Sequence, residues 1–105
     1  MSTPILVLTT VPNAVIAETI AQALLENHLA ACISELPIKS TYRWEGKLVR
    51  DDEIQLLIKT TRDRYSELEA KLLELHPYEV PEILAIAIEA GSPDYLNWIQ
   101  SDVDL

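Results

Sequence analysis

The chain has 105 residues, of which 49% are hydrophobic, and its net charge is −9. This length suits one domain with its own hydrophobic core, which we expect to span residues 1–105. The acidic charge argues against nucleic acid as a partner, because phosphate binding needs a basic face. The single cysteine excludes an intrachain disulfide, and no apolar run reaches the roughly 20 residues of a membrane span. With no signal peptide evident, we expect a cytoplasmic protein without a membrane partner.

The first quarter of the chain predicts a strand followed by a helix. Residues 5–9 (ILVLT) are apolar on both faces, which is typical of a central strand. Pro12 and Asn13 end this strand and offer an N-cap to a helix over residues 14–29, whose apolar residues recur at every fourth position. His28 falls in the last turn of that helix, where a cation is favoured by the helix dipole.

A long β-hairpin is predicted over residues 31–59. Its first arm, residues 31–36, is interrupted by Pro37, which implies an edge position or a bulge before pairing resumes at residue 38. Glu45 and Gly46 are candidates for the tight turn, and residues 47–59 form the returning arm.

The length of this hairpin has a consequence for assembly. Arms of about 13 residues would each span roughly 43 Å, which exceeds the reach of a compact core of this size. The tip carries Tyr42 and Trp44, which are costly to leave in water. We therefore expect the tip to pack on a neighbouring subunit. The alternative is that the arms bend at Pro37 and fold back.

The second half of the chain predicts a helix, a polar loop, a strand and a last helix. The helix covers residues 62–75, and the loop that follows, residues 76–82, contains two prolines. Residues 83–88 hold no polar side chain, which indicates a strand covered on both faces. Ser92 and a following proline start a helix that we expect to end near residue 100, leaving the acidic end of the chain frayed.

The order of these elements is β-α-β-β-α-β with an extra C-terminal helix. This order predicts an α+β fold of the ferredoxin-like, split β-α-β kind, with an antiparallel sheet that carries two helices on one face. The other face of such a sheet needs a cover. A homotrimer that packs sheet against sheet would provide it.

Six short motifs resemble the CutA family of divalent-cation tolerance proteins, in the right order over nearly the whole chain. They are LAAC at 29–32, LP at 36–37, YRWEGK at 42–47, IKT at 58–60, HPYEVPEI at 76–83 and DYLNW at 94–98. The resemblance implies a ferredoxin-like trimer, similar in architecture to PII signalling proteins, with a cleft between subunits. The positions that match the family's cleft motifs are Cys32, Trp44, Lys59, His76, Tyr78, Glu79 and Glu82.

Four of these residues are candidate metal ligands. Cys32 offers a soft ligand, His76 a borderline one, and Glu79 or Glu82 a hard one, a set that suits copper or zinc. The sequence alone does not bring them together. The plainer interpretations are that Cys32 is a small buried hydrophobe and that His76 caps a helix or hydrogen-bonds within its loop. Some relatives carry a second cysteine in the first strand, where this chain has threonine, so a two-thiol site within one subunit is not available.

The other three residues are candidates for lining the cleft. Trp44 and Tyr78 either face a ligand or pack at the interface between subunits, with their polar groups satisfied at its rim. Lys59 either pairs with a carboxylate of residues 76–82 or holds a small anion.

These residues support three hypotheses about function. The first is a trimeric protein that responds to divalent cations, copper above all, and binds metal weakly in the cleft. The second is a PII-like signalling or interaction module that binds a small anionic ligand or docks an unidentified protein. The third is an enzyme, since a histidine near glutamates can do acid–base work, but no nucleophile–base pair is apparent. We therefore predict no catalytic residue and no required cofactor.

Overall fold

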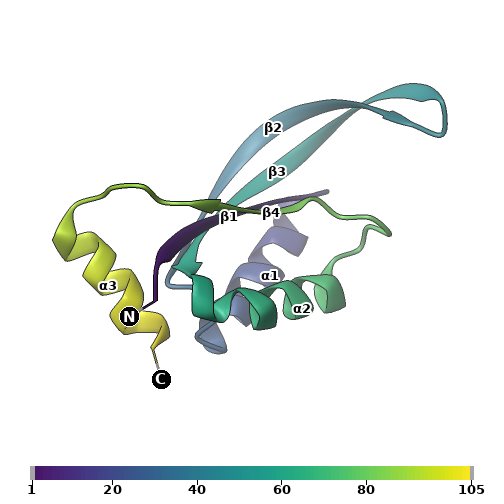
Figure 1. Ribbon diagram of the computed structural model, residues 1–105. Helices are drawn as coiled ribbons and strands as arrows, with labels where there is room; N and C mark the ends of the chain where they lie inside the picture. The colour runs from purple at the N-terminus through teal and green to yellow at the C-terminus, as the bar shows by residue number, and fades with distance from the viewer. Residues whose placement is uncertain (1, 105) are drawn as a thin grey trace.

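The computed structural model describes residues 2–104, which form a four-stranded antiparallel sheet in the order β2-β3-β1-β4 (Figure 1). The strands are β1 (Pro4–Val11), β2 (Cys32–Trp44), β3 (Lys47–Thr61) and β4 (Ile83–Ala87), and the helices are α1 (Ala14–Glu26), α2 (Tyr65–Leu75) and α3 (Pro93–Val103). A 3-10 turn, η1 (Arg62–Arg64), occupies the start of the helix predicted over residues 62–75. The predicted α+β, ferredoxin-like architecture is confirmed. None of the helices between residues 2 and 104 has the length and apolar composition needed to cross a bilayer.

The main hydrophobic core lies between one face of the sheet and the layer formed by α1 and α2 (Figure 1). Alternate residues of each strand face this layer, because successive side chains point to opposite faces of a sheet. The buried residues are Ile5, Val7, Val11, Ala17, Ile20, Leu24, Leu29, Ala30, Leu56, Ile58, Leu68 and Leu72. Among the described residues, the opposite face of the sheet carries no comparable layer, and the site described below lies along that face.

Both ends of α1 are fixed by asparagine side chains. Asn13 Oδ1 accepts a hydrogen bond from the Ile16 N–H at 2.9 Å, as the sequence predicted. At the other end, Asn27 Nδ2 donates to the Ala23 carbonyl at 2.7 Å, and His28 takes a positive φ of 54°. The helix therefore ends at Glu26 and not at residue 29, and His28 lies outside it.

The hairpin of β2 and β3 is regular along its whole length. Its register runs without a shift from Cys32 opposite Lys59 to Trp44 opposite Lys47, so the predicted interruption at Pro37 is wrong. The expectation of an edge position is confirmed, because β2 is the outer strand of the sheet. An edge strand tolerates a proline whose nitrogen faces away from the partner strand. Positive φ angles of 50° and 78° at residues 45 and 46 close the turn.

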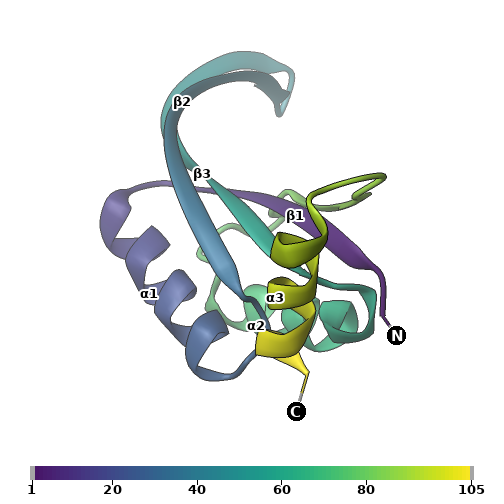
Figure 2. The ribbon, with the colours of Figure 1, turned by 90° about the vertical axis from the view of Figure 1, so that its left-hand side faces the viewer.

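The far half of this hairpin projects from the body of the subunit and curves as it leaves (Figures 1 and 2). With this hairpin included, the molecule measures 45 × 26 × 21 Å and has a radius of gyration of 14.3 Å. Tyr42 and Trp44 at the tip remain 40% and 47% exposed. The arms thus do not fold back onto their own core, and the tip is free for a partner.

Two expectations for the C-terminal third are wrong in the isolated chain. The strand β4 lies at the edge of the sheet, and Leu84 and Ile86 on its open face are largely exposed, so this strand is not covered on both sides. The last helix, α3, continues to Val103, beyond its predicted end near residue 100. The expected fraying of the acidic end is therefore wrong for residues 101–103. Val103 is buried with Ile99 and Ala31 in a small second cluster, which stabilises the last turn.

Candidate functional site

The polar loop of residues 76–82 is anchored on the end of β1 by His76. Its Nε2 donates to the Thr10 carbonyl at 2.8 Å, and its Nδ1 accepts from the Tyr78 N–H at 3.2 Å. This pattern fixes a neutral ring with the proton on Nε2. Burial of the ring lowers the pKa of His76 below its ordinary value, although the Thr10 carbonyl opposes the shift. The geometry matches the hydrogen-bonded interpretation of this histidine.

Tyr78 connects the same loop to β3. Its hydroxyl donates to Glu53 Oε2 at 2.7 Å, and its ring lies 4.9 Å from that of His76. Burial, and then the adjacent Glu53 carboxylate, raise the pKa of the Tyr78 hydroxyl. Glu53 is only 7% exposed, and the ion pairs within residues 2–104 do not include it. Glu53 is thus a buried acidic side chain whose hydrogen-bond donor is a phenol.

Sequence reasoning missed Glu53. It follows two aspartates, and a run of three acidic residues in a strand is typical of a polar, solvent-exposed stretch. The signal that could have found it is the alternation of side chains along a strand, because Glu53 lies six residues from Lys59, on the same face, and Lys59 was already a candidate for the cleft.

A second phenol–carboxylate pair continues this face of the hairpin outward. The Tyr42 hydroxyl donates to Asp51 Oδ2 at 2.5 Å, and this hydrogen bond raises the pKa of Tyr42. Tyr42, Asp51 and Glu53 all point to the same face in the register of β2 and β3. A strip of acids and phenols therefore runs from the polar loop toward the tip that carries Trp44.

Cys32 and Lys59 lie opposite each other at the other end of the same sheet face. Lys59 Nζ donates to Ser34 Oγ at 2.8 Å and to the Leu57 carbonyl at 3.4 Å. The ion pairs within residues 2–104 do not include Lys59, so it does not pair with a carboxylate of the polar loop of its own subunit. Burial, and then the Cys32 thiol, raise the pKa of Tyr95 in α3. Cys32 itself is partly buried.

The two ends of the face are too far apart to share an ion within one subunit. Cys32 is level with Leu6 of β1, since both are aligned with Lys59, whereas His76 binds the carbonyl of Thr10. Four residues of strand separate these levels by about 13 Å. Within residues 2–104, no three side chains of the His, Cys, Asp and Glu types are placed to hold a metal ion. Glu79 and Glu82 are exposed, without hydrogen bonds to the other two candidates.

Between these two ends the sheet face is apolar and uncovered. Leu36, Leu84 and Ile86 are between 45% and 53% exposed, and Leu6, Leu8 and Leu57 are partly so. A surface of this kind marks an interaction site. We call it the open sheet face. It is continuous with the hairpin, whose tip exposes further apolar side chains.

The protein belongs to the class of ferredoxin-like subunits that have a projecting hairpin. Its open sheet face is apolar, and a polar loop lies at one end of that face. The sequence model of the CutA1 divalent ion tolerance protein family matches residues 5–102. The chain is a member of that family.

Individual relatives agree with this assignment. The divalent-cation tolerance protein CutA of Thermus thermophilus is 46% identical over 97 residues, which cover 91% of this chain and 94% of the relative. The crystal structure of CutA from Xylella fastidiosa aligns with a TM-score of 0.95 at 42% identity and covers 98% of this chain and 100% of that one. A protein of Archaeoglobus fulgidus, described as the periplasmic divalent cation tolerance protein CutA, aligns with a TM-score of 0.94 at 38% identity, covering 96% and 99%.

Proposed function

We propose that the protein is a homotrimeric divalent-cation response protein that binds copper, or another divalent cation, weakly in a cleft between subunits. The observation that carries this proposal is the open sheet face with Cys32 at one end and the polar loop at the other. Because one subunit keeps the two ends apart, only a second copy seated on this face can bring a thiol and an imidazole to one ion. Seating a copy there would also cover the exposed leucines and isoleucine.

The hydrogen bonds of His76 explain why such a site would be weak. A metal needs a ring nitrogen with a free lone pair, and Nε2 carries the proton that binds Thr10. Nδ1 is the available ligand atom, but its lone pair accepts the Tyr78 N–H at 3.2 Å. Metal binding must therefore displace this hydrogen bond. Cys32 of one subunit and His76, Glu79 or Glu82 of another complete the proposed ligand set.

A copper titration of the reduced protein by calorimetry tests this proposal. We expect saturable binding that Cys32→Ala and His76→Ala each abolish, with the fold intact by circular dichroism. His28→Ala is the matched control, because it removes the only other histidine of the chain, which lies away from the open sheet face. Binding that is indifferent to both Cys32 and His76 would leave only general attraction to the acidic surface and contradict the proposed site.

A second candidate function, a PII-like signalling module that binds a small anion, is favoured by Lys59. Its ammonium group is partly buried and has three donors, of which two are directed at Ser34 and the Leu57 carbonyl. A metal-free thermal-shift screen with inorganic phosphate, nucleotides and small carboxylates tests this alternative. Stabilisation that Lys59→Gln removes would favour it. No shift with any of these anions would exclude them as ligands.

We also propose that the protein is not an enzyme and acts in the cytoplasm. The proposal that the protein is not an enzyme is supported by the hydrogen bonds of His76. Both of its ring nitrogens are engaged, so proton transfer by this histidine would first have to break one of these hydrogen bonds. The second rests on the sequence alone, and cell fractionation with an antibody tests it directly, since the Archaeoglobus relative is described as periplasmic.

A further inference from the structure

A polar cavity lies at the end of the sheet where β3 leads into η1. Its volume is about 320 Å³, which is at the small end of the range for ligand sites. Thr61 is paired with Pro4 in the final pair of the β1 and β3 register, so the cavity lies at the ends of these strands and shares no residue with the open sheet face. Its polar lining residues are Ser2, Thr61, Asp63, Arg64, Gln100 and Asp104.

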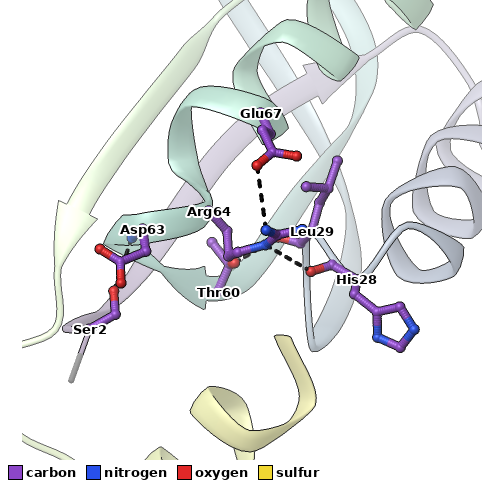
Figure 3. A network of polar contacts seen from close by, with 7 residues as sticks. All are labelled: Ser2, His28, Leu29, Thr60, Asp63, Arg64 and Glu67. Carbon is purple, nitrogen blue, oxygen red and sulfur yellow. Dashed lines mark hydrogen bonds and ion pairs between the residues drawn. The ribbon is translucent and has the colours of Figure 1, made fainter. Parts of the chain in front are cut away.

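Arg64 brings to this cavity a guanidinium group whose donors are only partly used. Its side chain is 18% exposed, Nε donates to the His28 carbonyl at 3.2 Å, and Nη1 donates to Glu67 Oε1 at 3.4 Å (Figure 3). A guanidinium has five N–H donors, and within residues 2–104 the other three have no acceptor. Because a largely buried charge without its full set of partners is costly, an anionic group in the cavity would stabilise Arg64.

Two carboxylates line the same cavity from different elements. Asp63 belongs to η1, where its backbone N–H donates to Ser2 Oγ at 2.9 Å, and Asp104 follows the last turn of α3. The ion pairs within residues 2–104 include neither of them. One positive and two negative groups make the lining acidic on balance, so a simple anion is disfavoured. The ligand of complementary charge has one anionic group and two cationic groups.

We propose that this cavity binds a basic amino acid, of which lysine is the simplest example. The α-carboxylate of the ligand accepts two parallel hydrogen bonds from Arg64, an arrangement that suits the planar guanidinium. The two ammonium groups pair with Asp63 and Asp104, and the methylene chain contacts Val103, which is the apolar part of the lining. None of these residues is a proposed metal ligand, so this proposal and the proposed function can fail independently.

Calorimetry of the metal-free protein, kept in EDTA, tests the site with L-lysine and two analogues that each lack one charged group. Cadaverine lacks the carboxylate, and ε-aminocaproate lacks the α-ammonium group. We expect saturable binding of L-lysine and binding of each analogue that is weaker by about tenfold or more, because each analogue leaves one charged group of the cavity without its partner. Physiological salt is kept throughout to screen general attraction to the acidic surface.

Three variants locate the binding. Asp104→Asn removes one carboxylate from an exposed position, so the fold is retained, and we expect the affinity for L-lysine to fall by about tenfold. Asp94→Asn is the matched control, because it makes the same change in the first turn of α3, outside the cavity, and should leave the affinity unchanged. Arg64→Lys keeps the positive charge but loses the planar fork, so it should weaken the binding of L-lysine and leave that of cadaverine as it was.

Three results would overturn the proposal. The first is no saturable heat with L-lysine up to about 10 mM. The second is equal affinity for L-lysine and cadaverine, which would mean that the acidic surface attracts any cation and that Arg64 recognises no carboxylate. The third is an equal effect of Asp104→Asn and Asp94→Asn, which would place the ligand outside this cavity.

Discussion

At the scale of single residues, the burial of the His76 ring has a consequence for stability. Burial lowers the pKa of the folded ring below its ordinary value of 6.5. On acidification, the unfolded chain therefore takes up a proton before the folded chain does. The free energy of unfolding must then fall as the pH drops through the ordinary value toward the lowered one, and below the lowered value this loss is complete.

Urea unfolding at several values from about pH 8 to about pH 5 measures this effect, which can reach about 1.4 kcal/mol per pH unit for one proton. We expect His76→Gln to flatten the dependence and His28→Gln to retain it. If all three proteins lose stability in parallel, the carboxylates and not His76 govern the decline.

Tyr78 and Glu53 offer a second prediction at this scale. Tyr78→Phe removes the hydroxyl that donates to Glu53 Oε2 and leaves a carboxylate of 7% exposure without that donor. We expect a loss of about 1–3 kcal/mol in the free energy of unfolding, measured with urea. Tyr42→Phe is the matched control, because it removes the same group from a 40% exposed tyrosine, and its effect should be well below that of Tyr78→Phe. Equal effects would argue against a special role for the buried carboxylate.

At the scale of elements, two helix caps that look alike in sequence differ in the structure. Asn13 accepts a hydrogen bond from the Ile16 N–H, whereas Ser92 occupies the N-cap of α3 without a side-chain hydrogen bond. Asn13→Ala should therefore lower the free energy of unfolding by about 0.5–2 kcal/mol, and Ser92→Ala should change it little. Thermal unfolding followed by circular dichroism distinguishes the two. Similar losses in both variants would mean that Ser92 stabilises its helix by a route other than capping.

The elements also show what the sequence could predict. Periodicity and capping residues located every helix and strand, because these signals are local. The ends were wrong where a distant contact decided them, as for α3, whose last turn is stabilised by the packing of Val103 near Ala31. Pro37 was misjudged because an edge strand accepts a proline without a break, and whether a strand lies at an edge depends on the whole sheet.

For the candidate site too, local signals in the sequence were informative and contacts between distant residues were not predictable. Spacing and residue type selected Cys32, His76 and Lys59, but could not show that the first two lie at opposite ends of one sheet face. The pairing of Lys59 with Ser34 and the burial of Glu53 arise from alignment across strands, which no local pattern encodes.

At the scale of the whole molecule, the hairpin tip predicts how subunits associate. Trp44 is 47% exposed in one subunit, so Trp44→Ala should leave the stability of the isolated subunit nearly unchanged. If the tip packs on a neighbour, the same change should weaken the association of the proposed trimer by about 2 kcal/mol or more. Losses of this size are typical when a buried aromatic side chain is removed from an interface. Sedimentation over a series of concentrations measures the association.

The control for this prediction is Val15→Ala, which shortens a 73% exposed side chain on α1, remote from the open sheet face. It should leave association unchanged. A Trp44→Ala protein that sediments and dissociates as the unchanged protein does would exclude the tip from the interface.

The central position of β1 has a consequence for how the chain reaches its fold. Ile5 pairs with Thr60 on one side and with Ala87 on the other, so this strand must wait for partners that are made 55 and 82 residues later. Until then its apolar residues have no sheet to join. Pairings this distant in sequence slow folding, because a large loop must close before any contact rewards it. The hairpin of β2 and β3, whose contacts are local, is the natural template on which the emerging chain assembles.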